Sequence, residues 1–316
     1  MPTLPSRALQ ALALGLALAL PLGVAPGARA EALKVDDSPE QPGRVRAQPV
    51  AAAVALLPKA VRLVQPGTLT VATNPGNLPF AVYASDTRTP IGGEPDVAQL
   101  IADSLGLKLD LVPTAWADWP LGLVSGKYDA VISNVTVTEA RKEKYDFSTY
   151  RHDLIGFYVR TDSSITAIAT PEQVAGLKVA VSSGTNQEEI LLRWAHENVA
   201  KGLKPTEILY YDDEAVQDLA LQSGRIDAYL GPNSTSAFKA ARDGKTRLVG
   251  TFSGGWPTVA EIAVATRKGA GLADAVTAAL NAQIANGNYG RALARWNLGA
   301  EAIPLSRTNP PGLPKS

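Results

Sequence analysis

The sequence predicts an α/β protein made of two lobes, and two observations support that prediction. Short β-rich runs alternate with amphipathic helices from about residue 67 onward, an order that produces open sheets covered by helices on both faces. In addition, Ser-Gly-Lys-Tyr-Asp-Ala-Val-Ile at 125–132 returns as Ser-Gly-Arg-Ile-Asp-Ala-Tyr-Leu at 223–230. Each copy joins a helix end, a glycine in the left-handed region and an Asp that leads a strand. Chance reuse of a common connection is one explanation; two similar lobes, each an open, mostly parallel sheet flanked by helices, is the other.

The individual elements follow from residue type and spacing. Strands are expected where β-branched and apolar residues gather between turns, at 69–73, 107–112, 155–159, 178–181, 208–211, 226–230, 247–250 and 262–265. Helices are expected where apolar residues recur at helical spacing, at 95–105, 187–197, 214–223, 235–242 and 272–286.

The first thirty residues predict the compartment. Arg7 precedes an apolar run at 8–20, which is followed by Pro and Gly residues and by the small-residue site Ala28-Arg29-Ala30. These features are typical of a cleaved secretory signal, and a retained membrane anchor is the alternative. We therefore expect a signal peptide and a periplasmic mature protein.

The remaining boundaries are set by composition and by the repeat. One short helix around 54–64 is expected in a Pro- and Ala-rich N-terminal stretch, and the chain should cross between lobes on two hinge strands near 156–160 and near 258–266. The predicted segments are the signal 1–30, a tether 31–66, lobe 1 at 67–157 plus 263–302, lobe 2 at 158–262, and a Pro-rich tail 303–316.

Composition excludes several classes of function. The chain has no Cys, so disulfides, thiolate metal sites and a lipid anchor on an N-terminal Cys are excluded. Two His are too few for a histidine-built metal site. With 30 basic and 30 acidic residues, the balance argues against nucleic acid or an anionic membrane surface as partner. No cofactor is expected.

One candidate binding loop follows the first copy of the repeat. In Ser-Asn-Val-Thr-Val-Thr-Glu-Ala-Arg at 133–141, polar residues alternate with Val, so Asn134 and Thr136 should share one face. Thr138 fits a helix N-cap, and Arg141 follows one turn later. An amide, hydroxyls and a guanidinium suit a carboxylate. The alternative is that Arg141 belongs to a solvated basic cluster.

A second candidate loop starts a helix in the other lobe. Val-Ala-Val-Ser-Ser-Gly-Thr-Asn-Gln-Glu at 179–188 is a strand, a glycine loop and a helix start. Free N–H groups there would attract an anion, although a well-capped helix is an equally good explanation. The loop lacks the lysine and spacing of a phosphate-binding loop.

The order of several short blocks resembles one protein family across about Leu69 to Trp296. The blocks are Gly67-Thr68-Leu69-Thr70-Val71-Ala72-Thr73, Gly93-Glu94-Pro95-Asp96-Val97-Ala98, Leu123-Val124-Ser125-Gly126-Lys127-Tyr128-Asp129-Ala130, Thr138-Glu139-Ala140-Arg141-Lys142, Tyr145-Asp146-Phe147-Ser148, Ser183-Gly184-Thr185-Asn186-Gln187-Glu188 and Arg267-Lys268-Gly269. They resemble the bacterial extracellular solute-binding proteins of family 3, periplasmic receptors of polar amino acid ABC importers. The resemblance implies the type II periplasmic-binding-protein fold, which closes on ligand like a clamshell.

The resemblance also implies a set of ligand-binding residues. Arg141 would grip the ligand's carboxylate, and aromatic side chains of the first lobe would cover the ligand. Helping residues would be Thr136 and the backbone near Asn134, with Gly184, Thr185 and Asn186 from the second lobe. The aromatic candidates are Phe80, Trp116 and Trp119, for which an ordinary place in the core is the alternative.

The sequence departs from the family pattern at the expected ammonium site. The family's Asp after the 226–230 strand is replaced here by Pro232, and the neutral Asn233, which could accept a hydrogen bond from the ligand, follows. Asn74 and Asn77 stand where an acid and an aromatic are common, and Asn74 is also an expected ligand-binding residue. An ammonium left without a counter-ion in a closed cleft costs several kcal/mol. The expected ligand is a small carboxylate-bearing polar solute (an amino acid, a modified amino acid or an opine-like molecule). The missing counter-ion favours a modified amino acid, an opine-like molecule or an organic acid over a plain amino acid.

The predicted function is that of the non-catalytic, monomeric binding component of an ABC importer, with an inner-membrane permease as partner. Two alternatives stay open: a dehydratase-like enzyme of the same fold, for which Glu94, Glu188 and Glu261 are conceivable acids or bases, and a stand-alone ligand sensor.

Overall fold

A computed structural model describes residues 35–59, 61–211 and 213–314. The predicted signal peptide 1–30 lies outside the described residues. Among the residues described, no helix is long and apolar enough to cross a membrane.

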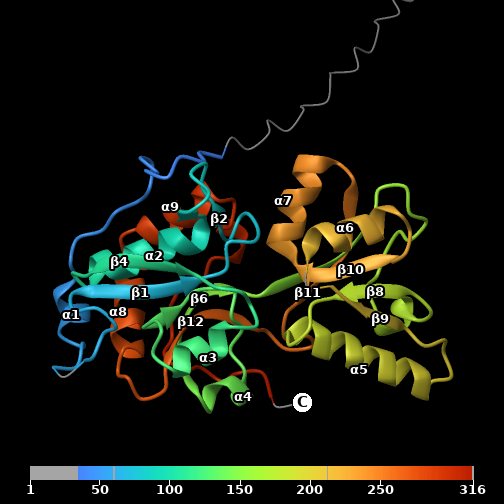
Figure 1. Ribbon diagram of the computed structural model, residues 1–316. Helices are drawn as coiled ribbons and strands as arrows, with labels where there is room; N and C mark the ends of the chain where they lie inside the picture. The colour runs from blue at the N-terminus through green and yellow to red at the C-terminus, as the bar shows by residue number, and fades with distance from the viewer. Residues whose placement is uncertain (1–34, 60, 212, 315–316) are drawn as a thin grey trace, which may run out of the picture. The chain divides into compact units, whose positions relative to one another are not determined.

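The first lobe is built on a five-stranded sheet with the order β4-β1-β5-β12-β6 (Figure 1). Its core lies on both faces of the sheet. Val71 and Val264 pack under α2, α8 and α9 on one face, while their neighbours Ala72 and Ala265 pack with Trp119 of α3 on the other. The elements of this lobe are α1 (Ala51–Val54), β1 (Thr68–Thr73), β2 (Val82–Tyr83), β3 (Pro90–Ile91), α2 (Gly93–Ser104), β4 (Lys108–Pro113), α3 (Trp119–Val124), β5 (Ala130–Val131), α4 (Glu139–Lys142), β6 (Tyr145–His152), β12 (Glu261–Arg267), α8 (Ala273–Ala285), α9 (Asn288–Arg295) and the 3₁₀ turn η2 (Gly299–Glu301).

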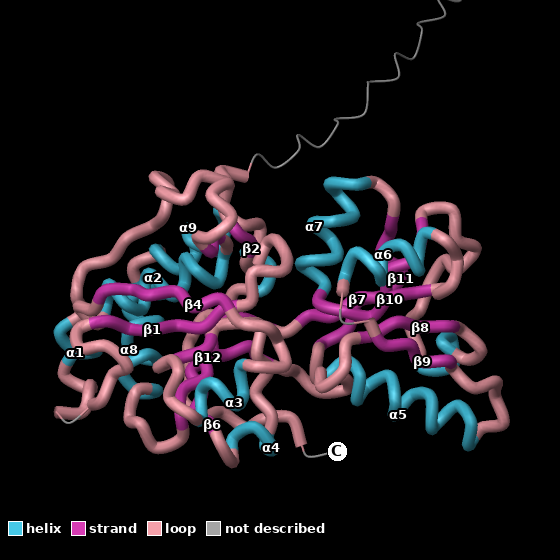
Figure 2. The backbone as a smooth tube through the Cα atoms, in the orientation of Figure 1, coloured by secondary structure: helices cyan, strands magenta, loops and turns pink. Residues whose placement is uncertain are grey.

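The second lobe repeats this plan, with the order β11-β7-β10-β8-β9 (Figure 2). Trp194 of α5 is fully buried with Phe157 and Leu230 on one face of the sheet. Ala180 and Leu221 of α6 form a smaller cluster on the other. The elements are β7 (Leu154–Arg160), η1 (Pro171–Val174), β8 (Lys178–Val181), α5 (Asn186–Ala200), β9 (Glu207–Tyr210), α6 (Glu214–Gln222), β10 (Ala228–Pro232), α7 (Asn233–Asp243) and β11 (Thr246–Ser253).

Both sheets are mixed rather than mostly parallel. In each, three strands run parallel (β4, β1, β5 and β9, β8, β10), and the other two pairings are antiparallel. The first antiparallel strand in each sheet, β12 or β7, is the one by which the chain arrives from the other lobe. A strand entering in this way runs opposite to its neighbours, which explains the difference from the prediction.

The repeated motif places one copy in each sheet, as predicted. Gly126 and Gly224 adopt φ of 76° and 72°, the left-handed conformation. The Asp129 N–H donates to the Thr70 carbonyl at 2.8 Å, and the Asp227 N–H donates to the Lys178 carbonyl at 2.8 Å. The side chains of Asp129 and Asp227 accept from the N–H groups of those same partners, at 2.9 and 2.8 Å. In both lobes, therefore, the same pair of hydrogen bonds made by an Asp fixes the start of a strand against its neighbour in the sheet.

The chain crosses between the lobes earlier than predicted. All of β7 pairs within the second sheet and β6 ends at His152, so the first crossing is at Asp153 rather than after residue 157. The second lies between Ser253, where β11 ends, and Glu261, where β12 begins. β6 was not predicted as a strand, which is why the first boundary was placed late.

Both terminal segments, the predicted tether and the Pro-rich tail, pack on the first lobe. Arg44 and Arg46 form ion pairs with acids of α2, at 2.8 and 2.7 Å, and the short helix lies at Ala51–Val54 rather than at 54–64. The Asn309 N–H donates to the Phe147 carbonyl at 2.9 Å, so the tail runs beside β6. Ile303 is buried in the core.

Candidate functional site

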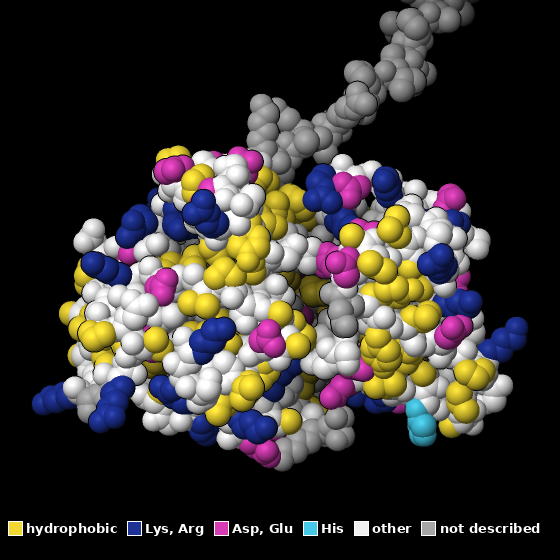
Figure 3. All heavy atoms as spheres, in the orientation of Figure 1, with side chains coloured by type: hydrophobic (Ala, Val, Ile, Leu, Met, Phe, Trp, Pro, Cys, Tyr) yellow, Lys and Arg dark blue, Asp and Glu magenta, His cyan; other side chains and the backbone are white. Residues whose placement is uncertain are grey.

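A cavity of about 1290 Å³ is lined by residues of both lobes, and the face in Figure 3 is hollowed between them. The residues lining it come from loops that follow the parallel strands: Asn74 after β1, Asn134 after β5 and Ser182 after β8. The carboxyl ends of parallel strands are the usual place for ligands in open α/β sheets. The cavity is therefore the candidate binding site.

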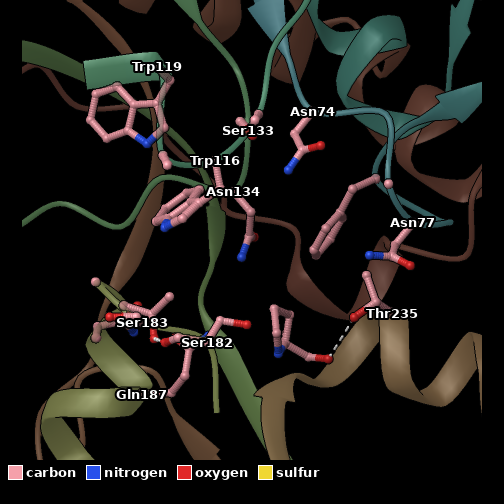
Figure 4. A pocket seen from close by; sticks show the side chains of 18 of the residues that line it. Asn74, Asn77, Trp116, Trp119, Ser133, Asn134, Ser182, Ser183, Gln187 and Thr235 are labelled. Atoms are coloured by element: carbon pink, nitrogen blue, oxygen red, sulfur yellow. Dashed lines mark hydrogen bonds between the residues drawn. The ribbon is translucent and has the colours of Figure 1, made fainter. Parts of the chain in front are cut away.

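The cavity gathers most of the predicted binding residues. Figure 4 shows Asn74, Asn134 and Trp116 projecting into the same space. The predicted residues in the wall are Asn74, Phe80, Trp119, Asn134, Arg141, Gly184, Thr185 and Asn186, and Trp116 and Asn77 lie there too.

Arg141 lies in the short helix α4, which begins at the predicted N-cap. The Thr138 hydroxyl accepts a hydrogen bond from the Arg141 N–H at 3.1 Å. The guanidinium donates to the carbonyls of Thr136 at 2.9 Å and of Gly184 at 3.2 Å, and it lies 5.6 Å from the centre of the Trp116 ring. Burial lowers the pKa of Arg141, an effect opposed by the carboxylate of Asp153.

Arg141 thus keeps its positive charge, and its own lobe satisfies only part of the hydrogen-bonding capacity of its guanidinium. No described acid lies within ion-pair distance of its guanidinium. A guanidinium stays protonated in proteins, and a half-buried cation held only by carbonyls favours an incoming anion.

Thr136 does not line the cavity, contrary to expectation. Its hydroxyl is buried and donates to Asp153 at 2.7 Å, with the Asn186 side-chain oxygen 3.1 Å away. The predicted alternation fails because Asn134 adopts φ of 49°, in the left-handed region, which turns the chain between the two residues. Thr136 contributes its carbonyl to Arg141 instead.

Asn233 also lies outside the cavity wall. It begins α7, and its side-chain oxygen accepts from the Tyr158 hydroxyl at 3.0 Å. Pro232 takes its place in the wall. The second lobe therefore presents no carboxylate at the position where the family pattern places one.

Asn186 joins the second lobe to the first crossing. Its amide donates to Asp153 at 2.9 Å and to the Gly254 carbonyl at 2.6 Å. Both partners lie in the segments that connect the two sheets. Asn186 therefore binds the hinge region as well as lining the cavity.

The helix start at 184–188 is already satisfied by its own side chains. The Thr185 hydroxyl accepts from the Glu188 N–H at 3.3 Å, and the Glu188 carboxylate accepts from the Gly184 N–H at 2.6 Å. A carboxylate of the protein occupies the place considered for an anion. The geometry thus favours the alternative of a well-capped helix.

Aromatic rings form one wall, as the resemblance implies. Trp116 and Trp119 meet edge to face with centroids 6.1 Å apart, and Trp119 lies 5.0 Å from Tyr145. Trp119 is 2 % exposed, so it belongs to the core as much as to the cavity.

A buried charge cluster beside the cavity was not found from the sequence. Arg151 of β6 is buried and ion-paired with Glu301 of η2. Its guanidinium donates to the Asn134 side-chain oxygen at 2.6 Å and lies 4.4 Å from the centre of the Phe80 ring. Glu94 of α2, 2 % exposed, lines the cavity next to it. The only indication of this cluster in the sequence is Arg151 itself, an arginine within a run of residues that otherwise favours a strand.

The described residues contain no cluster of His, Cys or acidic residues able to hold a metal ion. The model for the bacterial extracellular solute-binding proteins, family 3, matches residues 69–299. The chain belongs to this family. The match covers both sheets and every loop of the cavity.

Individual relatives are similar over different lengths. The L-cystine-binding protein TcyJ of Escherichia coli (strain K12) is 37% identical over 165 residues, 52% of this chain and 58% of the relative. The chain thus spans somewhat over half the length of that curated relative. The octopine-binding periplasmic protein of Rhizobium meliloti is 24% identical over 65% of this chain and 74% of its own length.

Solved structures share the fold. The ancestral amino acid-binding protein AncCDT-1, described as a precursor of cyclohexadienyl dehydratase, is 27% identical with a TM-score of 0.62. That similarity covers 73% of this chain and 95% of the ancestral protein. The predicted type II periplasmic-binding-protein fold is confirmed.

Proposed function

We propose that this solute-binding protein receives a small carboxylate-bearing solute in the periplasm and delivers it to the inner-membrane permease of an ABC importer. The observation that carries the proposal is Arg141, a half-buried cation in the cavity wall without an acidic partner among the described residues. A planar guanidinium binds a carboxylate through two parallel hydrogen bonds.

Binding is proposed to close the two lobes around the solute. Two features support this: only two segments join the sheets, and loops of both lobes line one cavity. A ligand that contacts both lobes favours the closed arrangement by its differential affinity for it. The closed form would be the state presented to the permease.

The solute is proposed to be an amino acid, a modified amino acid or an opine-like molecule. The names of the relatives support this class, since they bind L-cystine and octopine. The cavity, at about 1290 Å³, has room for every solute of this class. The aromatic wall would cover the apolar part of such a solute.

The protein is proposed to act without catalysis, and a dehydratase-like enzyme is the second candidate. One observation favours the enzyme: burial raises the pKa of Glu94, a carboxyl in the cavity wall, as expected for a general acid. The relationship of AncCDT-1 to a dehydratase points the same way. Consumption of a bound compound would decide for the enzyme.

A thermal-shift screen tests the proposal. The purified protein is screened against L-cystine, other amino acids, octopine, small organic acids and prephenate, with Arg141→Ala and the exposed Arg242→Ala in parallel. A ligand that binds only the folded state raises the melting temperature. We expect a carboxylate compound to stabilise wild type and Arg242→Ala but not Arg141→Ala, with Kd raised at least about a hundredfold in the latter. Equal stabilisation of all three proteins would refute the role of Arg141.

A further inference from the structure

Glu94 is a buried carboxylate in the cavity wall that the proposed function does not use. It is the second residue of α2 and is 2 % exposed. Its Oε1 atom accepts from the Asn134 N–H at 2.6 Å and from the Tyr150 hydroxyl at 2.9 Å. Its Oε2 atom accepts no hydrogen bond from any residue that the structure describes. One oxygen of a buried acid is therefore left to the cavity.

The charges around Glu94 do not balance. Arg151 is the buried cation of the cluster: it is ion-paired with Glu301, donates to Asn134, and forms a longer ion pair of 3.7 Å with the Glu94 Oε1 atom. Asp153, also buried, is a third acid in this neighbourhood, and Arg141 is the second cation, because its charge acts on Asp153. Three acids thus share two cations, so a further cation entering the cavity would be stabilised here.

Glu94 and Arg141 line the same cavity and contact one short stretch of backbone. The Asn134 N–H contacts Glu94, and the Thr136 carbonyl contacts Arg141. These two backbone groups are separated by at most roughly 10 Å of extended chain. A zwitterionic ligand in the shared cavity can therefore place its carboxylate on Arg141 and its ammonium toward Glu94, each through a charge-assisted hydrogen bond.

The wall holds three other described acids, Glu143, Asp213 and Glu214, and each of them has an interaction of its own. Asp213 caps α6, where its carboxylate accepts from the Val216 N–H at 2.9 Å. Glu214 accepts from the Asn77 side chain, and the nearby ammonium of Lys239 offsets part of its charge. Pro232 offers no charge. Glu94 is thus the wall carboxylate best placed to receive a cation.

We infer that Glu94 binds the ammonium group of the ligand through its free Oε2 atom, in place of the acid that the second lobe lacks. This inference rests on the proposed function and narrows it. The ligand is a zwitterion whose ammonium lies next to the carboxylate held by Arg141, and both charges are held by the first lobe. The second lobe then contributes shape and hydrogen bonds rather than charge.

The test compares amino acids with analogues that lack only the amino group. The probe pairs are L-cystine with 3,3′-dithiodipropionate, L-glutamine with glutaramate, and L-arginine with 5-guanidinovalerate, titrated calorimetrically into wild type, Glu94→Gln, Glu94→Asp, Glu214→Gln and the exposed Glu40→Gln. We expect wild type to prefer one amino acid over its analogue by about a hundredfold. Glu94→Gln should lose this preference, with affinity for the analogue unchanged, whereas Glu94→Asp and Glu40→Gln should keep it.

The outcomes separate this inference from the proposed function. If wild type binds an analogue as tightly as its amino acid, or if Glu214→Gln rather than Glu94→Gln removes the preference, the assignment of Glu94 is overturned and the carboxylate receptor stands. If no probe binds wild type, both fail together. Should Glu94→Gln not fold, as judged by its melting transition, the paired affinities of wild type and Glu94→Asp decide: an undiminished preference in both supports the inference, and its absence overturns it.

Discussion

Replacing Arg151 by Met tests whether one cation holds the charge cluster of the first lobe together. Arg151 is 1 % exposed and pairs with Glu301, and its guanidinium also donates to Asn134 at 2.6 Å. Met has similar length, so the change removes charge and hydrogen bonds more than volume. Breaking a buried ion pair on one side costs about 3–5 kcal/mol, because the remaining charge is left uncompensated. For a chain of this size, that lowers the melting temperature by roughly 10 °C.

The loss should depend on pH, and its sign follows from the acids left behind. Burial raises the pKa of Glu94 and of Asp153, and Arg151 opposes both shifts. Without Arg151 the pKa of both carboxyls in the folded state rises further above the unfolded values. A carboxyl of this kind takes up a proton on folding, so the stability of the variant falls as pH rises through the folded pKa. The deficit should therefore be largest near pH 7.5 and smaller near pH 5.

Urea unfolding of wild type and Arg151→Met at the two pH values measures this directly. The exposed Arg242→Met, whose guanidinium pairs with Asp243 at the surface, is the matched control and should change stability by less than about 0.5 kcal/mol. A deficit for Arg151→Met below about 1 kcal/mol, or one that is equal at both pH values, would refute the reasoning.

Three further predictions concern the backbone. Deleting 306–316 removes the backbone bridges of Thr308 to β6 and of Leu313 to Thr138, the N-cap of the helix that carries Arg141. The deletion should cost about 2 kcal/mol of stability and weaken binding of a carboxylate ligand, as urea unfolding and calorimetry would show. Gly126→Ala and Gly224→Ala, at φ of 76° and 72°, should each cost about 1 kcal/mol, and an unchanged unfolding midpoint would contradict the left-handed conformation. Gly290→Ala, in α9 with open space around it, should instead raise the midpoint slightly.

The sequence predicts best those features that are local. The glycine of each repeat copy ends the helix directly before it, so both copies could be placed correctly from local pattern, although the Asp side chains accept from N–H groups 59 and 49 positions away. β6 could not, because Arg151 interrupts its apolar pattern and is neutralised by Glu301, a partner 150 positions away in the chain. Burial of such an arginine is not visible in a local window.

The same distinction explains the site. Arg141 was predicted from its loop and from the family pattern, and it lies in the cavity. Thr136 was placed on the wrong face because the left-handed φ of Asn134 is a property of the folded loop rather than of residue spacing. The free oxygen of Glu94 depends on contacts made by Asn134 and Tyr150 at once, and no one-dimensional pattern shows that.

The position of β12 in the first sheet has a consequence for the order in which the chain can fold. β12 lies between β5 and β6, yet in the chain it follows the whole of the second lobe. The second lobe is one continuous stretch and can form its sheet as soon as β11 has been made. The first sheet must wait for residues 261–267 to close a gap of more than one hundred positions, and contacts so distant in sequence form slowly. The second lobe can therefore be complete while the first sheet still lacks the strand that joins β6 to β5.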